Sequence, residues 1–177
     1  IAGAGSGKTR VLTHRIAHLI ETGVEPGRIL ALTFTNKAAG EMKERVRKLL
    51  EEQALPPHQI IGGGAWIGTF HALGVYLLRR DGHCIGIPRL FTILDEEDAL
   101  SIVRRIIKER HLDPKQFQPP RIRHIISALK NKPFIASDEN ESAETDYYPQ
   151  EIQDVYKRYE EELTSAHALD FDDLLLR

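Results

Sequence analysis

The chain opens with Ile1-Ala2-Gly3-Ala4-Gly5-Ser6-Gly7-Lys8-Thr9, a glycine-rich stretch that ends in Gly-Lys-Thr. A loop that cradles nucleotide phosphates needs small residues, so that successive backbone N–H groups can converge on phosphate oxygens. It also needs a lysine that reaches the β- and γ-phosphates and a hydroxyl that holds Mg²⁺. Lys8 supplies that charge and Thr9 that hydroxyl. The stretch therefore predicts a phosphate-binding loop for ATP or GTP.

The sequence around this loop supports the prediction. The strict pattern G-x-x-x-x-G-K-[ST] places glycine where this chain has Ala2, but alanine still permits close approach of a ligand when its φ is negative. A phosphate loop must lead into a helix whose N-terminal dipole favours the anion. Such a helix is indicated by apolar residues at helical spacing, followed by Gly23 as its end: Leu12, Ile16, Leu19 and Ile20. The alternative is a glycine-rich turn that precedes a helix by chance.

We assign the following residues to the nucleotide site. Catalysis is assigned to Lys8 and Thr9, and the Mg²⁺ contact to Thr9. Contacts to the nucleotide are assigned to Ala2, Gly3, Ala4, Gly5, Ser6, Gly7, Lys8, Thr9 and Arg10. The cofactors are then ATP and Mg²⁺.

Composition limits the class of protein. With 177 residues and 41% apolar content, the chain can bury a sizeable core. It has no apolar run of membrane-spanning length and no signal sequence, so we expect a cytoplasmic protein without membrane contact. Cys84 is the single cysteine, which excludes an intramolecular disulfide and fits a reducing compartment.

The first half of the chain alternates between strand and helix patterns. Ile1 has the position of the last residue of a strand, because a phosphate loop follows one, so we expect the sequence to be a fragment there. Residues 29–33 and 65–70 read as strands, and helices are expected after each, the second over residues 71–80. This alternation predicts a doubly wound α/β sheet, in which ligands lie beyond the carboxyl ends of the strands.

The second half of the chain has a helical pattern. Asp95 is expected to cap a long helix, and two more are expected over residues 121–130 and 149–165. Strands largely stop after Pro88, and residues 136–148 read as a polar, acidic loop. Residues 101–132 hold nine Lys/Arg against two Asp/Glu, whereas residues 138–162 hold two against ten. The basic block is either a footprint for a phosphate backbone or one of two solvated helix faces that pair with each other.

Two further segments follow the expected strands at their carboxyl ends. In the first, Thr33, Asn36 and Lys37 can contact phosphates, and Phe34 can stack on a base. Its alternative is a capped helix start with Phe34 in the core. In the second, Gly68-Thr69-Phe70-His71, the histidine is more often a structural group than a ligand contact.

Together these segments resemble the superfamily 1 DNA helicases of the UvrD/PcrA/Rep type. In that family Ala-Gly-Ala-Gly-Ser-Gly-Lys-Thr is the common form of the first motif, so Ala2 belongs to the signature. Thr33-Phe34-Thr35-Asn36-Lys37-Ala38-Ala39 is similar to motif Ia, and Gly68-Thr69-Phe70-His71 is similar to motif Ib. Both line the path of single-stranded DNA in the family. The resemblance therefore implies nucleic-acid contacts from Thr33, Phe34, Thr35, Asn36, Lys37, Thr69, Phe70 and His71.

The resemblance also implies a fold. It is a P-loop NTPase (RecA-like) α/β fold, a parallel sheet with an inserted all-helical subdomain called 1B. Residues 1–92 would form the first part of motor domain 1A, residues 93–166 the 1B-like insertion, and residues 167–177 the return into 1A. The segment Leu169-Asp170-Phe171-Asp172-Asp173-Leu174-Leu175 resembles this return. We expect Asp170 to cap a helix and not to bind Mg²⁺, because the apolar residues follow the acids.

The function that the resemblance implies is that of an N-terminal fragment of an ATP-dependent helicase and translocase with the family's 3′ to 5′ polarity, in DNA repair or replication. Its partners would be single-stranded DNA, single-strand/duplex junctions, and duplex DNA through the basic 1B-like helices, in a nucleoid-associated protein. The family's acidic Mg²⁺ motif, second motor domain and adenine-reading glutamine lie outside the chain, so we expect negligible hydrolysis and no unwinding from it alone. Three alternatives remain: a RecB/AddA-type helicase-nuclease, a small-molecule kinase, and a binding module that docks partners through 1B.

Overall fold

The computed structural model describes residues 7–52, 64–131 and 148–176. Residues 1–6, with Ile1 and most of the phosphate loop, lie outside the described residues, and so does most of the expected acidic loop. The chain forms two compact units, Ile1–Leu73 and Gly74–Arg177, here called the N-terminal and C-terminal units. Within the described ranges, no helix has both the length and the apolar character needed to cross a bilayer.

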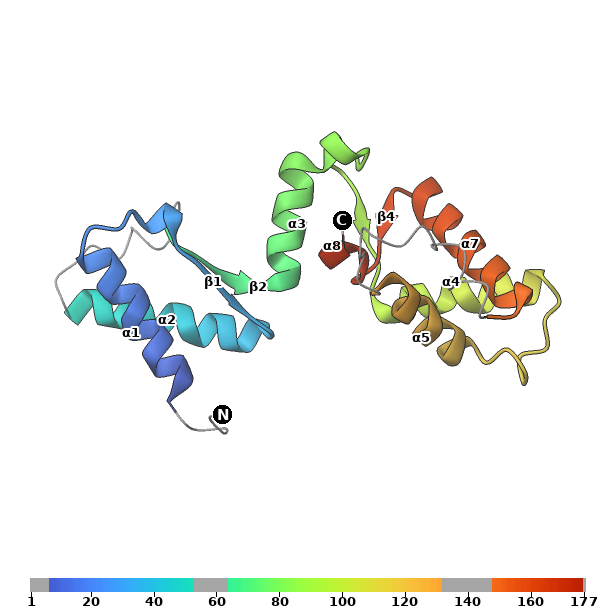
Figure 1. The fold of residues 1–177 in the computed structure, drawn as a ribbon, viewed down its shortest axis with the longest axis horizontal. Helices are drawn as coiled ribbons and strands as arrows, with labels where there is room; N and C mark the ends of the chain where they lie inside the picture. Colours follow the sequence, from blue (N-terminus) through green and yellow to red (C-terminus); the bar gives the residue numbers. More distant parts are fainter. Residues whose placement is uncertain (1–6, 53–63, 132–147, 177) are drawn as a thin grey trace. The chain divides into compact units, whose positions relative to one another are not determined.

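The N-terminal unit pairs two parallel strands with helices (Figure 1). Its elements are α1 (Lys8–Glu21), a 3₁₀ turn (Pro26–Arg28), β1 (Leu30–Thr33), α2 (Asn36–Glu52), β2 (Trp66–Thr69) and the start of α3 (Phe70–Asp81). β1 and β2 run parallel, with Leu30 opposite Trp66 and Thr33 opposite Thr69. The mixed α/β class expected from the sequence is confirmed at this level, with small parallel sheets and many helices.

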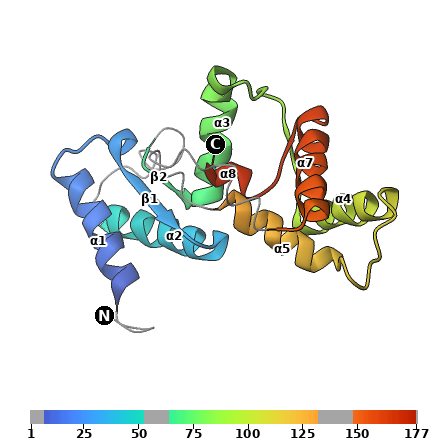
Figure 2. The same ribbon diagram turned by 45° about the vertical axis from the view of Figure 1, so that its right-hand side comes forward.

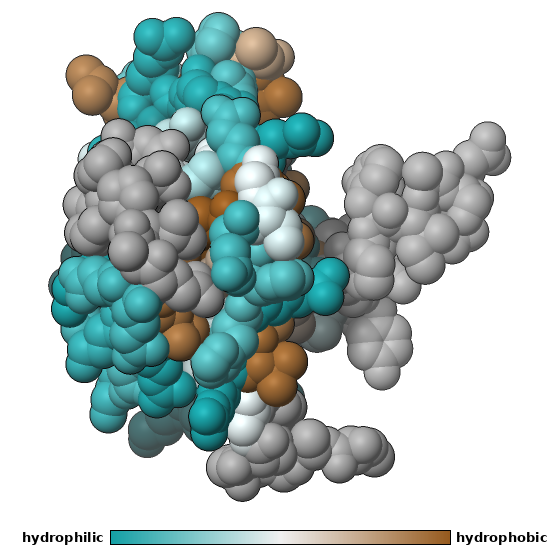
Figure 3. Space-filling view, turned by 90° about the vertical axis from the view of Figure 1, so that its left-hand side faces the viewer, coloured by the Kyte–Doolittle hydropathy of each residue, from teal (hydrophilic) through white to brown (hydrophobic). Residues whose placement is uncertain are grey.

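A single apolar core fills the N-terminal unit. α2 packs against α1 and against both strands, and Figure 2 shows α2 running beside β1. The core residues are Ile16, Ala17, Ile20, Ile29, Met42, Val46, Leu50, Ala65 and Ile67. The face drawn in Figure 3 is mostly hydrophilic, with smaller apolar areas between the polar side chains.

The two ends of the apolar stripe on α1 differ in how well the sequence predicts them. Leu12, expected on the apolar face, is 50% exposed, and the buried Thr13 takes the inward position one residue later. The Thr13 hydroxyl donates to the Arg10 carbonyl at 2.8 Å, so its burial leaves no unpaired group. At the other end Gly23 has φ 89° and ends the helix as expected, with Val24 N–H donating to the Leu19 carbonyl.

The C-terminal unit joins the rest of α3 to a helical bundle and a second strand pair. Its further elements are a 3₁₀ turn (Gly82–Ile85), β3 (Thr92–Ile93), α4 (Glu96–Glu109), α5 (Pro119–Lys130), α7 (Gln150–Ser165), β4 (Ala168–Leu169) and α8 (Asp173–Leu176). β3 pairs in parallel with β4. The expectation that strands largely stop after Pro88 missed β3 and β4, because a strand of two residues is too short to show alternation.

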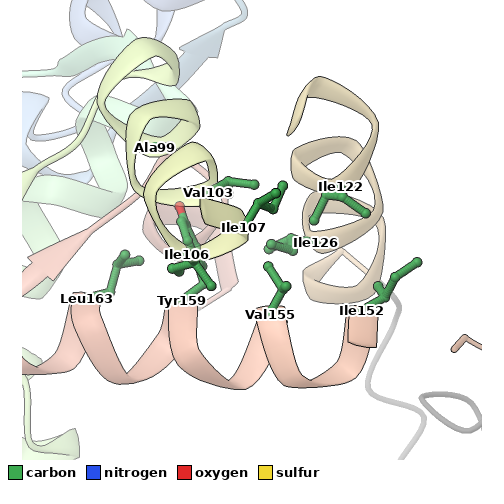
Figure 4. Packing of buried hydrophobic residues seen from close by; sticks show 10 residues of the cluster. All are labelled: Ala99, Val103, Ile106, Ile107, Ile122, Ile126, Ile152, Val155, Tyr159 and Leu163. Atoms are coloured by element: carbon green, nitrogen blue, oxygen red, sulfur yellow. The ribbon is translucent and has the colours of Figure 1, made fainter. Parts of the chain in front are cut away.

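The bundle core is built from the apolar stripes of its three helices, and Figure 4 shows side chains from α4, α5 and α7 meeting between them. The core residues are Ala99, Val103, Ile106, Ile107, Ile122, Ile126, Ile152, Val155, Tyr159 and Leu163. Asp95 caps α4 as predicted: its carboxylate accepts the Asp98 N–H at 2.8 Å, and the Asp98 side chain accepts from Asp95 N–H in return.

A glycine allows two helices of the C-terminal unit to approach each other closely. Gly74 lies on α3, and a Cβ built there would sit 2.0 Å from the carbonyl oxygen of Leu174 on α8. The obstacle is backbone, which cannot rotate away as a side chain can. α3 and α8 therefore come this close only because residue 74 has no side chain.

We expect Gly74→Ala to lower the free energy of unfolding by about 1–3 kcal/mol, since overpacking at a rigid contact forces the two helices apart. Urea unfolding followed by far-UV circular dichroism measures the change. Gly40→Ala on α2 is the matched control, because a Cβ there meets nothing within 4 Å. The control should be neutral or stabilising, as expected for alanine inside a helix. Equal effects of the two substitutions would contradict the steric explanation.

Candidate functional site

The start of α1 has the backbone form expected after a phosphate loop. Gly7 precedes the helix with φ 77°, a left-handed conformation that glycine adopts without strain. The N-cap residue Gly7 has no side chain with which to cap this end, and the first turn contains no acidic residue. Thr9 and Arg10 are exposed there. The first N–H groups of a helix lack partners within it, so this end favours an anion.

The parallel register brings the two other predicted segments together. Thr33 and Thr69 are opposite each other at the carboxyl ends of β1 and β2. Phe34 and Phe70 follow directly, and their ring centroids are 5.5 Å apart with the planes tilted by 42°. Phe34 is 90% exposed and Phe70 42% exposed. The alternative that Phe34 lies in the core is therefore wrong.

The threonine hydroxyls of this strand end bond to the protein's own backbone. Thr33 Oγ1 donates a hydrogen bond to the Thr35 carbonyl at 3.0 Å and lies 3.4 Å from the Gly68 carbonyl. Thr35 Oγ1 accepts the N–H of Ala38 at 3.1 Å, which caps the start of α2. Thr69 Oγ1 accepts the N–H of Ala72 at 3.2 Å and so caps α3 in the same way.

The remaining predicted contacts lie at the same edge. Asn36 and Lys37 are exposed on the first turn of α2, and His71 is half-buried on the first turn of α3. The strand end thus combines two aromatic rings, a cation and two helix starts. Aromatic faces stack on bases, and lysines and helix N-termini contact phosphates.

The acidic segment at residues 170–173 holds a buried charge network in the C-terminal unit. Asp170 is fully buried, and its carboxylate accepts from Tyr159 Oη at 2.9 Å and from Lys130 Nζ at 3.1 Å. Lys130 Nζ also donates to Asp173 at 2.9 Å and pairs with Glu160 at 2.8 Å. The ammonium group therefore lies among three carboxylates contributed by α7, α8 and the turn between β4 and α8.

A second cation extends the network to Asp172. Arg123 donates to the Asp172 carboxylate at 3.1 Å and lies 3.3 Å from Glu96 at the start of α4. Ser127 Oγ donates to the other Asp172 oxygen at 3.1 Å, and Asn131 donates to the same atom at 2.6 Å. Arg123, Ser127 and Lys130 were not among the predicted site residues, although their spacing places them on one polar stripe of α5.

The expected cap at Asp170 is confirmed. Its carboxylate accepts the Asp173 N–H at 3.0 Å, and Asp173 accepts the Asp170 N–H at 3.3 Å. The reason given from the sequence was incomplete, because β4 does end directly before Asp170. What occupies the Asp170 carboxylate is Lys130, Tyr159 and a backbone N–H. Within the described ranges, no group of three or more potential ligand side chains is arranged to hold a metal ion.

The network shifts the pKa values of its members. Burial raises the pKa of Asp170, but Lys130, the Asp173 N–H and Tyr159 outweigh burial and leave the pKa below its ordinary value. Burial lowers the pKa of Lys130, but Asp173, Glu160 and Asp170 outweigh it and leave the pKa raised. Burial and the Asp170 charge raise the pKa of Tyr159. The lowered pKa keeps Asp170 charged at neutral pH, while the raised pKa values keep Lys130 charged and Tyr159 neutral.

The structure favours the helix-pairing interpretation for much of the basic block. Arg105 pairs with Glu162, and Arg110 lies 2.7 Å from Asp154, so α4 and α7 pair across the bundle. Arg104 bonds to Glu97 on α4 itself, while Arg123 and Lys130 belong to the buried network. Three exposed cations of the block have no carboxylate within 4 Å in the described part of the chain: Lys108, Lys115 and Arg121.

Comparison with known proteins identifies the class. The whole chain, residues 1–177, matches the family model of the UvrD/REP helicase N-terminal domain. The chain is 49% identical over 177 residues to the ATP-dependent DNA helicase PcrA of Staphylococcus aureus (strain Mu50), and 51% identical over 180 residues to that of Bacillus subtilis (strain 168). Each match covers 99% of this chain and 23% of the relative.

The chain therefore belongs to the UvrD/REP helicase N-terminal domain family, which confirms the resemblance seen in its motifs. It spans about a quarter of the length of the curated relatives it matches.

We expect Lys130→Met to lower the free energy of unfolding by about 3–5 kcal/mol, because it leaves buried carboxylates without their cation. Urea unfolding at neutral pH measures this loss. Arg104→Met is the control: it breaks the exposed pair with Glu97, and such pairs contribute little. Similar small effects of both substitutions would show that the network contributes no more than a surface ion pair.

Proposed function

We propose that the chain is the N-terminal, nucleotide-binding part of an ATP-dependent DNA helicase and single-stranded DNA translocase. The observation that carries this proposal is the match of all 177 residues to a helicase N-terminal domain family. The relatives are named ATP-dependent DNA helicase PcrA, and that name does not favour a RecB/AddA-type nuclease or a small-molecule kinase. A nucleoid-associated cytoplasmic location and a role in repair or replication follow from this assignment.

The domain organisation in this proposal is that of a RecA-like motor domain with a helical insertion. Residues 1–92 and 167–177 would belong to domain 1A, and residues 93–166 would form the 1B-like subdomain. The bundle of α4, α5 and α7 supports the helical assignment, since its core contains residues from these three helices. The short parallel pairs β1/β2 and β3/β4 are compatible with strands of a larger sheet.

ATP and Mg²⁺ are the proposed cofactors. The left-handed Gly7 and the uncapped first turn of α1 fit a phosphate group, since both leave backbone N–H groups facing an anion. Lys8 would hold the β- and γ-phosphates and stabilise charge on the transferred phosphoryl group, and Thr9 would ligate Mg²⁺. Residues Ala2–Arg10 complete the proposed cradle. Bound ATP supplies the free energy for movement along DNA.

Single-stranded DNA is proposed to cross the carboxyl ends of β1 and β2. Phe34 and Phe70 would stack on bases, and Asn36, Lys37 and His71 would contact the backbone. The exposure of Phe34 supports this role, because a solvated aromatic ring at a strand end gains apolar contact when a base covers it. Single-strand/duplex junctions are the proposed substrate.

A duplex contact through the 1B-like helices is proposed on a smaller set of residues than the basic block. Arg105, Arg110 and Lys130 already neutralise carboxylates of the bundle. Within the described part of the block, the exposed Lys108, Lys115 and Arg121 are the cations left to meet phosphates. A phosphate that binds a paired cation must first displace its carboxylate, which costs free energy, whereas a phosphate that binds one of these three cations displaces no carboxylate of the described residues.

We expect Phe34→Ala to weaken binding of a labelled single-stranded oligonucleotide by about 1–3 kcal/mol at any salt concentration, since stacking does not depend on counterions. Lys37→Ala should instead reduce the slope of log K against log[salt] by about 0.7, one single-strand phosphate contact. Fluorescence anisotropy across a salt series separates the two effects.

Lys43→Ala is the control for this experiment. Lys43 is exposed on the same helix, about 10 Å beyond Lys37 along its axis, and should change neither quantity. Binding that ignores the Phe34 and Lys37 substitutions would remove the strand end from the DNA path. Binding of a small phosphate acceptor in place of the oligonucleotide would support the kinase alternative.

We expect Lys8→Ala to weaken Mg²⁺-ATP binding by about 1.5–3 kcal/mol, the usual value of a charge-assisted hydrogen bond. Titration with a fluorescent ATP analogue measures it, and Lys37→Ala should bind as the parent chain does. The sequence Asp-Glu-x-x-Asp is absent from the 177 residues, so we propose that they bind nucleotide weakly and hydrolyse it negligibly. Robust DNA-stimulated hydrolysis of ATP by this chain would contradict that proposal.

A further inference from the structure

The Thr33 hydroxyl occupies a different environment from the polar side chains that follow it in the chain. Thr33 is buried at the last position of β1, whereas Thr35, Asn36 and Lys37 are exposed. Its single hydroxyl hydrogen points at protein carbonyls, that of Thr35 at 3.0 Å and that of Gly68 at 3.4 Å. A buried hydroxyl that already donates to the backbone has no hydrogen left to give to a phosphate.

The two carbonyls near Thr33 belong to the backbone that carries the aromatic pair. Phe34 lies between Thr33 and Thr35, so the bond from Thr33 to the Thr35 carbonyl closes a short turn around Phe34. Gly68 is two residues before Phe70, on the neighbouring strand. One side chain therefore contacts the backbone on both sides of the pair.

Phe34 has few other constraints. Its ring is 90% exposed, and the contact that the structure shows for it is the tilted ring of Phe70. A side chain without a packed environment keeps its position only as well as its backbone does. The backbone around Phe34 is held by the strand pairing, by the Thr35 cap on α2 and by the Thr33 hydroxyl.

We infer that Thr33 is a positioning residue, which holds the Phe34 ring against Phe70 and does not itself contact DNA. The inference rests on the proposed function in one respect: the aromatic pair is taken as the surface on which bases stack. Thr33 then has a different role from Thr35 and Thr69. The hydroxyl oxygens of those two residues accept backbone N–H groups, so these bonds do not use their hydroxyl hydrogens.

A double-mutant cycle tests how Thr33 acts. Thr33→Val keeps the shape of the side chain and removes the hydroxyl, and we expect it to weaken single-stranded DNA binding about 3- to 10-fold. In the Phe34→Ala background the same substitution should change binding less than 1.5-fold, because the ring that it positions is gone. A direct contact predicts the same loss in both backgrounds, and that result would overturn the inference, as would no loss in either.

Two further variants separate positioning from folding. Thr33→Ser keeps the hydroxyl and should restore binding to within about 2-fold of the parent chain. Thr13→Val removes a hydroxyl that is also buried, with Thr13 1% exposed against 9% for Thr33, and that is bonded within α1, so it matches the loss of one buried hydrogen bond in the same unit. It should leave DNA binding unchanged. A loss in Thr13→Val as large as in Thr33→Val would reduce the effect to general stability and overturn the inference.

The aromatic contact can also be measured without DNA. Nuclear Overhauser effects between the rings of Phe34 and Phe70, in a chain with isotope-labelled phenylalanine, report their separation directly. We expect these signals in the parent chain, in Thr33→Ser and in Thr13→Val, and a loss of at least half their intensity in Thr33→Val. Unchanged signals in Thr33→Val would overturn the inference. If Phe34→Ala leaves DNA binding intact, the proposed function fails, and the ring signals still decide the role of Thr33.

Discussion

The parallel pairing of β1 with β2 is the constraint on which the candidate nucleic-acid site depends. Thr33 and Thr69 share a register position, so the residues that follow them leave the sheet at the same edge. The sequence separates Phe34 from Phe70 by more than thirty positions, and the register alone brings their rings to 5.5 Å. A slip by one residue would turn the side chains of a strand to its other face and separate the pair.

At this edge the polar and aromatic residues have distinct physical tasks. Thr35 and Thr69 satisfy the first N–H groups of α2 and α3, which a helix cannot satisfy within itself. Because the helices start directly after the strands, Phe34 lies on the two-residue connection between β1 and α2, and Phe70 is the first residue of α3. The binding surface that we propose is therefore built from exposed groups, Phe34, Asn36 and Lys37, on a frame of bonded hydroxyls.

The sequence predicted the elements with strong local signals. The helix expected after residue 33, the helices expected over residues 121–130 and 149–165, the Asp95 cap of α4 and the end of α1 at Gly23 were all found. It did not predict β3 or β4, which are two residues long each, or the outward position of Leu12. The proximity of Phe34 to Phe70 depended on pairing between distant segments, which no local pattern encodes. Lys130 and Arg123 were read as part of a basic block, since burial cannot be seen from charge alone.

The buried charge network explains how so short a helix as α8 holds its place. Four residues, Asp173–Leu176, cannot form a stable helix by themselves. The conformational entropy lost when the first turn forms exceeds the free energy gained from its hydrogen bonds. Apolar packing of Leu174 stabilises α8 but does little to fix its orientation, because apolar contacts are not directional. Asp170, Asp172 and Asp173 instead meet fixed donors: Lys130, Arg123 and Ser127 on α5, and Tyr159 on α7. Such a network tolerates few alternative arrangements, since each would leave a buried charge unpaired. The main contribution of these carboxylates is therefore to fix the position of α8 against α5 and α7. The capping hydrogen bonds between Asp170 and Asp173 fix the start of the helix as well.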